Sequence, residues 1–473
     1  MDEANQKKIS EDTKKPFFVA GGTLYPDIPS YIKRPADKML LEYTLSGDFC
    51  YILTTRQMGK SSLMIRTAKR LREQAVKVAV IDLTTIGTTG DIDTWYIDLL
   101  TELVAQLQIS TSVELWWEVN VKLGQLRRFV NFLRDVILAE ISQQRIVIFI
   151  DEIDTTLRLS FRDDFFAAIR SLYNARADTP AFRQLTFVLI GVASPIDLIA
   201  DPARTPFNIG QAIPLQDFSQ FDISILQAGL EEIYPEQARD ILRRVYHWTE
   251  GHPYLTQKLC LEIANSGEIH WTNEQVDHWV EQLFLSEKAH SEPSLQFAQD
   301  WILTHPQSRQ LLVLYRNILK GESVEHNDRL VIQNQLQLSG LVKVAKGRLY
   351  TRNEIYHYVF DLAWAEENIA DLAFFVAGGT LRADIASYVM RDADDELYRS
   401  ILESKFSYVF APPQMGKSSL MVRTNQRMQS EGIKPVAVYL SDDKQIALEE
   451  WYRGLAFQIK GELRLSVNLN DWW

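Results

Sequence analysis

The sequence predicts an α/β protein: a parallel sheet flanked by helices, followed by a helical domain, a winged-helix domain and a partial second module. Three observations predict this. Apolar strand patterns alternate with helical patterns through residues 49–192, which is typical of a parallel sheet with crossover helices. From residue 217 the strand pattern disappears until a hairpin pattern near residue 346. Residues 17–67 then recur at 374–424 with 29 identities in 51 positions.

The elements of the first module follow from apolar spacing. Strands are expected at residues 49–53, 76–83, 145–150 and 185–192. Helices are expected at 57–73, 93–107, 126–140 and 165–176, several with i, i+3, i+4 spacing. The run at 145–150 is continuously apolar, as in a strand buried on both faces. Four more helices are expected within 221–285, and three helices and a hairpin within 305–360.

These patterns divide the chain into five segments. We expect a disordered tail at 1–16, the α/β domain at 17–214, a helical lid domain at 215–304, a winged-helix domain with a connector helix at 305–370, and a partial second module at 371–473. The second module duplicates residues 17–117. The repeat is far too long for a solenoid and therefore indicates a domain duplication.

Composition narrows the class of protein. Hydrophobic residues make up 46% of the 473 residues, enough for real cores. No apolar run is long enough for a membrane helix, residues 1–15 are too polar for a secretory signal, and the two cysteines form no disulfide framework. We therefore expect a cytoplasmic protein with no membrane partner. The net charge of −12 argues against a chain-wide nucleic-acid footprint.

A phosphate-binding loop is predicted at residues 54–61 (TTRQMGKS), between a strand and a helix. In a P-loop, backbone N–H groups and the helix N-terminus cradle phosphates. Lys60 would reach the β- and γ-phosphates, and the Ser61 hydroxyl would ligate Mg²⁺. The pattern thus predicts a P-loop NTPase with these nucleotide-binding residues: Thr54, which replaces the usual first glycine, Arg56, Gln57, Met58, Gly59, Lys60, Ser61 and Ser62.

Two carboxylates complete the predicted catalytic set. Asp151 and Glu152 end the apolar run at 145–150. Asp151 would hold the Mg²⁺ shell, and Glu152 would act as general base, with Lys60 as the third catalytic residue. Asp154 either tunes this pair or caps the following helix, and capping is favoured. Ser194 follows the next strand, where it either senses the γ-phosphate or begins a helix together with Pro195.

Basic residues suggest two further roles. Arg170, Arg176 and Arg204 are candidate arginine fingers, in cis or across a subunit interface, or ordinary surface cations. On the predicted hairpin, basic side chains that could contact a DNA backbone cluster at Lys343, Lys346, Arg348 and Arg352. The candidate recognition helix at 330–338 is rich in glutamine, which favours a structural or regulatory role.

The second copy repeats the loop as Gly416, Lys417 and Ser418. Two occurrences in the same context argue against a chance Gly-Lys-Ser. The copy has no counterpart of the strand that carries Asp151, so we expect weak phosphate binding and no ATP hydrolysis by this module alone. An incomplete sheet would leave an open edge, so we also expect self-association or docking on a partner.

Several motifs together resemble the bacterial AAA-like domain family, which is close to the STAND signalling ATPases. They are residues 31–37 (YIKRPAD), 56–63 (RQMGKSSL), 95–96 (WY) and 150–154 (IDEID). The resemblance implies an ATPase core, a helical lid and a winged helix, with ATP and Mg²⁺ bound between core and lid. Residues 251–254 (GHPY) resemble the Gly-x-Pro element of STAND lids. By that resemblance His252 and Pro253 would touch the nucleotide; a helix-breaking turn is the open alternative. Arg34 ends residues 31–34, where relatives place an arginine segment near the base.

We therefore expect a STAND-like switch that binds ATP, hydrolyses it slowly and exposes an assembly surface for self-association or a partner protein. A DNA-associated ATPase of origin-recognition or transposition type, binding through the winged helix, is the alternative. A scaffold with a vestigial nucleotide site is disfavoured, because Lys60, Ser61, Asp151 and Glu152 are all intact.

Overall fold

The computed structural model describes residues 16–25, 27–87, 91–199, 206–286, 292–374, 388–412, 415–431, 433–438, 448–463 and 469. The predicted tail at 1–16 and the candidate finger Arg204 lie outside the described residues, apart from Pro16. The chain forms two compact units, residues 1–366 and 367–473.

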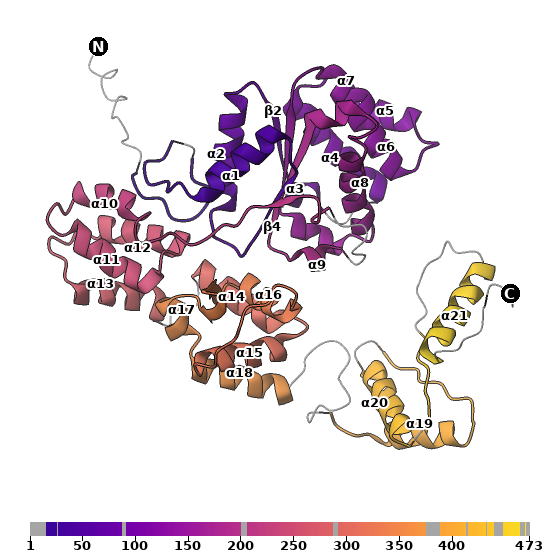
Figure 1. The fold of residues 1–473 in the computed structure, drawn as a ribbon. Helices are drawn as coiled ribbons and strands as arrows, with labels where there is room; N and C mark the ends of the chain where they lie inside the picture. Colours follow the sequence, from indigo (N-terminus) through magenta and orange to yellow (C-terminus); the bar gives the residue numbers. More distant parts are fainter. Residues whose placement is uncertain are drawn as a thin grey trace, which may run out of the picture. The chain divides into compact units, whose positions relative to one another are not determined.

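A five-stranded parallel sheet lies at the centre of the first domain, as the alternating pattern predicts (Figure 1). Its order is β2-β3-β4-β1-β5, with strands Lys77–Asp82, Ile146–Asp151, Leu185–Gly191, Cys50–Leu53 and Gln211–Ala212. All its strand pairs are parallel, and β4 lies between β1 and β3. The loops after β1, β3 and β4 therefore meet at one edge of the sheet, where ligands of such sheets bind.

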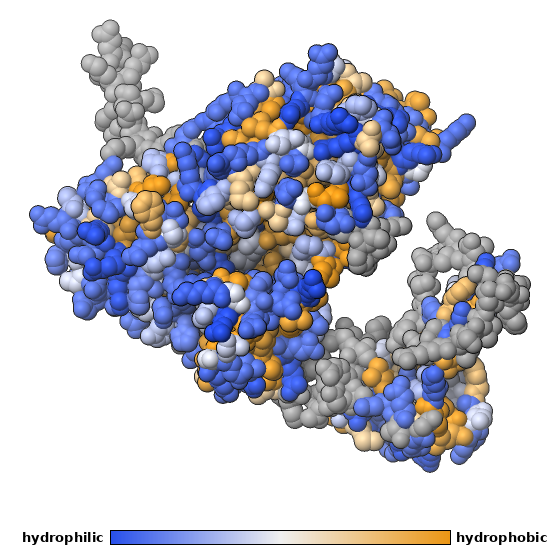
Figure 2. Space-filling model, in the orientation of Figure 1, coloured by the Kyte–Doolittle hydropathy of each residue, from blue (hydrophilic) through white to orange (hydrophobic). Residues whose placement is uncertain are grey.

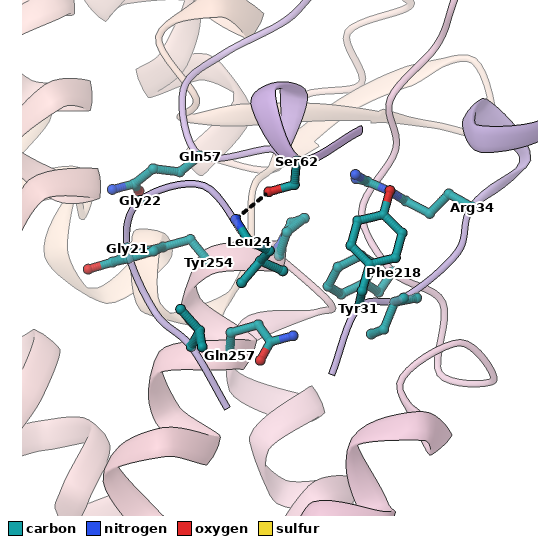
Figure 3. Close-up of a pocket in the computed structure, with 14 residues that line it drawn as sticks. Gly21, Gly22, Leu24, Tyr31, Arg34, Gln57, Ser62, Phe218, Tyr254 and Gln257 are labelled. Atoms are coloured by element: carbon teal, nitrogen blue, oxygen red, sulfur yellow. Dashed lines mark hydrogen bonds between the residues drawn. The ribbon is translucent and has the colours of Figure 1, made fainter. Parts of the chain in front are cut away.

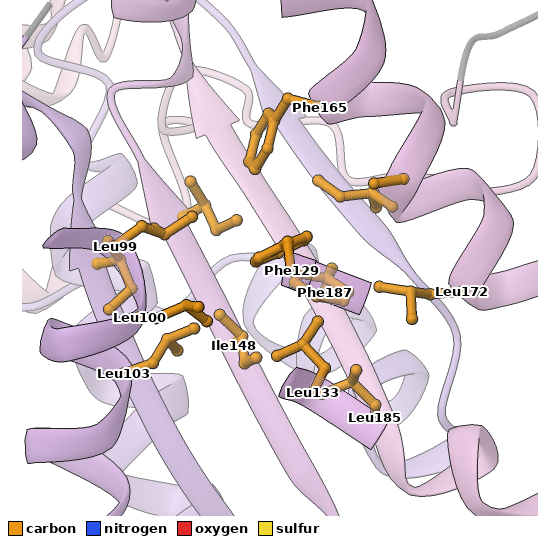
Figure 4. Packing of buried hydrophobic residues seen from close by; sticks show 14 of the residues in the cluster. Leu99, Leu100, Leu103, Phe129, Leu133, Ile148, Phe165, Leu172, Leu185 and Phe187 are labelled. Carbon is orange, nitrogen blue, oxygen red and sulfur yellow. The ribbon is translucent and has the colours of Figure 1, made fainter. Parts of the chain in front are cut away.

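Helices cover both faces of this sheet. They are α1 (Pro35–Ser46) and α2 (Lys60–Arg72) on one face, and α4 (Ile92–Leu107), α6 (Gln125–Phe132) and α8 (Arg162–Asn174) on the other. Alternate residues of β3 enter different clusters: Ile148 packs with α4, α6 and α8 (Figure 4), and Phe149 packs with α1 and α2. Burial on both faces explains why the β3 sequence is continuously apolar.

Short elements link these helices to the sheet. They are α3 (Leu83–Ile86), α5 (Val113–Val119), α7 (Leu138–Glu140), α9 (Pro195–Leu198), a π-helical turn at Leu133–Ile137 and 3₁₀ turns at Ile153–Arg158 and Pro180–Gln184. The helix predicted at 126–140 is therefore interrupted by the π-helical turn. The helix predicted from residue 57 begins only at Lys60, because Gln57 and Gly59 have φ angles of 61° and 80°.

A side chain closes the β2 edge of the sheet. The Gln106 amide on α4 accepts a hydrogen bond from the backbone N–H of Val80 (2.7 Å) and donates one to its carbonyl (2.6 Å). An exposed strand edge is a template for unwanted pairing. Gln106 takes the place of a neighbouring strand at this position and so blocks such pairing.

The rest of the first unit is helical apart from one hairpin. The elements are α10 (Ser224–Glu231), α11 (Ala238–Thr249), α12 (Pro253–Asn265), α13 (Asn273–Val280) with a π-helical turn at Glu281–Leu285, α14 (Pro293–Thr304), α15 (Ser308–Leu319), α16 (Val331–Leu338), β6 (Val342–Ala345), β7 (Arg348–Thr351), α17 (Glu354–Val359) and α18 (Leu362–Phe374). The predicted hairpin is present, and its turn residues Lys346 and Gly347 both have positive φ. We call residues 308–359 the hairpin module.

The second unit contains α19 (Asp392–Leu402), α20 (Lys417–Ser430) and α21 (Leu448–Leu463). The strand expected before its loop is not formed in the described residues 388–412. Phe406 and Phe410 are instead 97% and 90% exposed, whereas the corresponding Phe49 is 4% exposed. In the first unit β1 pairs with β4 and β5. These come from residues 185–212, outside the region repeated in the second copy, so the strand prediction was wrong for lack of pairing partners.

No helix within the described ranges is long and apolar enough to cross a membrane. Figure 2 shows a face that is largely hydrophilic, with apolar residues scattered over it in small groups.

Gly251, which precedes α12, cannot accept a side chain. Its φ is +77°, and an added Cβ would lie 1.9 Å from the Phe218 carbonyl oxygen. Gly267 has nearly the same φ, +74°, but open space around it. We therefore expect Gly251→Ala to reduce the free energy of unfolding by about 2–5 kcal/mol and Gly267→Ala by about 1 kcal/mol. Urea unfolding followed by circular dichroism measures both. Equal losses would contradict the close approach of Phe218.

Candidate nucleotide-binding site

The loop between β1 and α2 has the shape of a phosphate cradle. Gly59 stands at the N-terminus of α2 in the left-handed region, and Leu63 N donates to the Gly59 carbonyl in the first turn. A Cβ at Gly59 would lie 3.0 Å from Arg34 Nη2, so a larger residue would crowd that guanidinium. The helix N-terminus and the preceding backbone N–H groups are suited to an anion.

Lys60 is buried beneath this loop. Its ammonium donates to the carbonyls of Thr54 (3.0 Å) and Thr55 (2.8 Å). Burial lowers the pKa of Lys60 to about 8, although the nearby carboxylates of Glu152 and Asp151 act in the opposite direction. The charge is thus held by its own loop, and a phosphate would supply the acceptors that these carbonyls now provide.

Ser61, at the start of α2, and Asp151, at the end of β3, come together. The Ser61 hydroxyl donates to Asp151 Oδ2 at 3.3 Å, and Asp151 is only 7% exposed. Burial raises the pKa of the Asp151 carboxyl, while the backbone N–H of Glu152 and the charge of Lys60 lower it. A hydroxyl beside a carboxylate is the oxygen chemistry that Mg²⁺ prefers. These two residues fit a Mg²⁺ ion.

Glu152 follows in a strained conformation. Its φ is 55°, in the left-handed region that non-glycine residues rarely adopt, and its N–H donates to Asp151 Oδ1 at 2.9 Å. Such outliers concentrate at functional sites. Burial and the neighbouring carboxylates of Asp154 and Asp151 raise the pKa of Glu152, which makes its carboxylate a better proton acceptor.

The loop after β4 is held by two aspartates. Asp154 Oδ1 accepts from Val192 N (2.9 Å) and thus joins the end of β3 to that of β4; the favoured capping role was wrong. Ser194 caps α9, and its hydroxyl donates to Asp197 Oδ2 (2.6 Å). Both backbone bonds of a capping box are also present between Ser194 and Asp197. The helix-start alternative is therefore formed, and the sensor role of Ser194 stays a prediction.

Arg34 fixes the loop from the side of α1. Nη1 donates to the carbonyls of Met58 (2.9 Å) and Gln216 (3.2 Å), and the guanidinium lies over the Phe218 ring. Burial lowers the pKa of Arg34, and Asp37 and Asp217 favour its charge. Arg34, which the sequence predicted as a site residue, thus contacts the loop directly.

A pocket opens beside the loop, lined by Gln57, Gly59 and Ser62 from the loop and α2, and by Pro253 from the start of α12 (Figure 3). Ser62 Oγ accepts a hydrogen bond from Leu24 N (3.0 Å), so the segment before α1 passes over α2. Sequence reasoning missed Leu24, Phe218 and Gln257 in this pocket. The exact repeat of residues 17–24 was a signal for the first, but nothing marked the other two.

His252 lies apart from the residues that line this pocket. It caps α12, where Nδ1 accepts from Leu255 N (3.4 Å), and its ring stacks on Tyr356. Burial lowers the pKa of His252 to about 3; the charges of Arg352 and Lys343 act in the same direction and Asp217 opposes them. The residue is held as a neutral structural histidine.

Two predicted loop residues face the hairpin module or α14 instead of the cradle. Arg56 lies over the Phe297 ring of α14. Met58 is buried, and Arg352 Nη2 lies 2.8 Å from its sulfur. Arg352 also pairs with Asp217 at 2.7 Å. The loop is thus packed against the chain that follows β7.

Arg176 is excluded as an arginine finger in cis. It donates to the carbonyl of Leu185 and lies over the rings of Phe49 and Tyr173. Leu185 begins β4, so Arg176 is at the edge of the sheet opposite the loop. Arg170 lies on α8, and its role as an arginine finger stays a prediction.

The second unit repeats the loop geometry. Lys417 donates to the carbonyls of Ala411 (2.6 Å) and Pro412 (2.7 Å), and Gly416 has a φ of 77°. Arg391 Nη1 donates to Met415 O at 2.8 Å, as Arg34 does to Met58. Ser418 begins the same helix, one residue after Lys417. In its described residues the second loop therefore repeats the lysine, glycine and arginine contacts of the first.

The buried neutral His252 makes acid unfolding testable. Above pH 6.5 the histidine is neutral in both the folded and unfolded states. Between pH 6.5 and 3 only the unfolded chain takes up the proton, so the free energy of unfolding falls with falling pH, by up to about 1.4 kcal/mol per unit. His252→Asn keeps a capping side chain and cannot titrate. We expect a shallower dependence in urea unfolding from pH 4.5 to 7.5, and an unchanged slope would contradict this assignment.

Known proteins include relatives of this chain. A family model described as an AAA-like domain matches residues 19–361 and again residues 376–473. A WD repeat-containing protein of Synechocystis sp. is 38% identical over 369 residues, which cover 75% of this chain and 31% of that relative. The chain thus spans less than a third of that protein.

Two solved structures are similar over most of this chain. A Walker-type ATPase of Pyrococcus abyssi is 15% identical, with a TM-score of 0.45 over 72% of this chain and 99% of that one. The ORC2 protein of Aeropyrum pernix is 14% identical, with a TM-score of 0.42 over 71% and 92%. The family model matches well over half of the residues, and the chain therefore belongs to the AAA-like domain family.

Proposed function

We propose that this protein is an ATP-binding switch of the STAND type that hydrolyses ATP slowly at its first loop. One observation carries the proposal: the chain after β7 lies directly on the phosphate loop, through Arg352 with Met58 and Asp217. A change in the loop on nucleotide binding would therefore reach the hairpin module, which we propose to be a winged helix.

The loop residues would bind the triphosphate by exchanging partners. Lys60 would leave the carbonyls of Thr54 and Thr55 for the β- and γ-phosphate oxygens. Thr55 also lies under the hairpin module, since a Cβ at Gly340 would be 3.1 Å from its Oγ1. Rearrangement of Thr55 therefore perturbs the surface against which Gly340 packs.

Ser61 and Asp151 would hold Mg²⁺, which neutralises phosphate charge and favours loss of the γ-phosphoryl group. Glu152 would take the proton of the attacking water as its oxygen bonds to the γ-phosphorus. The bond from that phosphorus to the bridging oxygen then breaks, and ADP leaves with the electron pair. Catalysis would depend on positioning and on the raised pKa of Glu152.

The hairpin module makes further polar contacts with the nucleotide domain and the lid. Gln335 donates to Asp197 Oδ2 at 2.6 Å, which is the carboxylate that also binds Ser194. Lys343 forms an ion pair with Glu250, beside Gly251. Asn353 donates to the Thr249 carbonyl at 3.2 Å. The contacts support a closed resting state that the γ-phosphate would open.

The DNA-associated alternative has weaker support. Lys343 and Arg352 are already paired with Glu250 and Asp217, so only Lys346 and Arg348 of the predicted basic cluster face solvent. Phosphate contacts supply most of the affinity for DNA. In this conformation the hairpin presents a small basic surface to a duplex.

The catalytic assignment is tested by two substitutions. Lys60→Ala should abolish ATP binding, because it removes the ammonium that would move from the carbonyls of Thr54 and Thr55 to the β- and γ-phosphates. Glu152→Gln should bind ATP within about twofold of wild type and lower turnover by at least about 100-fold. Calorimetry measures binding and phosphate release measures turnover. Lys417→Ala is the matched control in the second loop, and a loss of turnover equal to that of Lys60→Ala would contradict hydrolysis at the first loop alone.

The switch is tested at Arg352. Truncation leaves the half-buried Asp217 without its ion-pair partner and weakens the closed state. We expect Arg352→Ala to speed release of a fluorescent ADP analogue at least about tenfold in stopped-flow experiments. Arg348→Ala, on the exposed side of the same hairpin, is the control. If both variants release ADP at the wild-type rate, the contact does not govern exchange.

A further inference from the structure

The pocket beside the loop has the features of a site that recognises the base of a nucleotide. Its walls are largely apolar, with Ile32 and Phe218 on the side of α1 and Pro253 and Tyr254 at the start of α12. The loop residues Gln57, Gly59 and Ser62 line the same cavity. This inference rests on the proposed nucleotide function: with phosphates on the loop, the base of the nucleotide enters this pocket.

One buried polar side chain in the pocket has a fixed orientation. Gln257 lies on α12 with 4% of its surface exposed, and its Nε2 donates to the Ser30 carbonyl at 2.7 Å. A carbonyl oxygen only accepts hydrogen bonds, so the amide nitrogen must face Ser30. The amide oxygen is therefore turned away from Ser30, and its orientation is not open to a flip.

That oxygen has no partner. Gln257 Oε1 is fully buried and makes no hydrogen bond within the described residues. An unsatisfied buried acceptor is costly, and native proteins rarely keep one unless something else supplies a donor. In Figure 3 the Gln257 side chain extends from α12 and lies below Leu24, with its amide nitrogen toward the side of Tyr31. The missing donor is thus expected from whatever fills the pocket.

We propose that Gln257 Oε1 accepts a hydrogen bond from the exocyclic 6-amino group of adenine and makes the site select ATP over GTP. Guanine carries a carbonyl oxygen at this position, which would face the Gln257 oxygen as a second acceptor. The bond to Ser30 prevents the amide from turning to offer its nitrogen instead. Selection therefore comes from an unpaired acceptor that only one of the two purines satisfies.

Gln57 is the other residue that could recognise the base. Its Oε1 is also buried without a partner and also lines the pocket. Unlike Gln257, it lies on the phosphate loop beside Gly59, and no hydrogen bond among the described residues fixes the orientation of its amide. The experiment must therefore separate these two glutamines.

The test compares Mg²⁺-bound ATP, GTP and purine riboside triphosphate, which lacks the 6-amino group, by calorimetry on the full chain. For the wild type we expect purine riboside triphosphate to bind about tenfold more weakly than ATP, and GTP about 100-fold more weakly. Gln257→Leu should bind ATP about tenfold more weakly and bring ATP and purine riboside triphosphate within about twofold of each other. Gln57→Leu should keep the preference for ATP over purine riboside triphosphate.

The other outcomes overturn the inference. Equal wild-type binding of ATP and purine riboside triphosphate refutes it without any variant, and so does a preference that survives Gln257→Leu or disappears in Gln57→Leu. If Gln257→Leu does not fold, Gln257→Met preserves the volume and is measured instead. Tight binding without base preference leaves the proposed function intact and rejects only the role of Gln257. No binding of any triphosphate rejects both.

Discussion

The nucleotide domain depends on one buried cation. Arg34 donates to the loop at Met58 O and to Gln216 O at the exit from the sheet, and it lies over Phe218. Burying a guanidinium is costly unless its donors find acceptors. Arg34 has these only if the loop, α1 and residues 216–218 hold their positions together. The cradle, one wall of the pocket and the connection to the helical part are thus fixed by a single set of hydrogen bonds.

The same packing explains why the loop and the hairpin module are coupled. The Met58 carbonyl accepts a hydrogen bond from Arg34, and the Met58 sulfur contacts Arg352. One residue therefore contacts both arginines. Arg352 is compensated by Asp217, next to the Gln216 carbonyl that Arg34 binds. The two arginines therefore meet the same short segment from opposite modules. Displacing either one requires a new partner for a half-buried aspartate or a buried carbonyl.

Local patterns predicted the sheet and the loop well, because strand period, loop glycine and helix start are encoded in neighbouring residues. The four longer strands, the hairpin turn at Lys346 and the meeting of Ser61 with Asp151 follow from such patterns. Ion pairs and hydrogen bonds between residues far apart in the sequence could not be predicted from it. Lys343 and Arg352 looked like a surface for DNA but are ion-paired to Glu250 and Asp217. His252 was expected as a nucleotide contact or as part of a helix-breaking turn; it caps α12 and stacks on Tyr356, contacts that its sequence context did not reveal. Nothing near Gln257 in sequence reveals the Ser30 carbonyl.

The second unit separates what is local in this site from what is not. There the lysine again donates to the two loop carbonyls and the arginine again binds the residue before the glycine, although no strand is formed in the described residues before the loop. The cradle therefore folds from its own sequence and one preceding helix. The pairing of Ser61 with Asp151 does not, because it needs β1, β4 and β3 to run parallel so that the ends of β1 and β3 lie at one edge of the sheet. The duplicated loop thus keeps the contacts of its lysine and arginine, whereas the approach of Ser61 to Asp151 depends on the sheet.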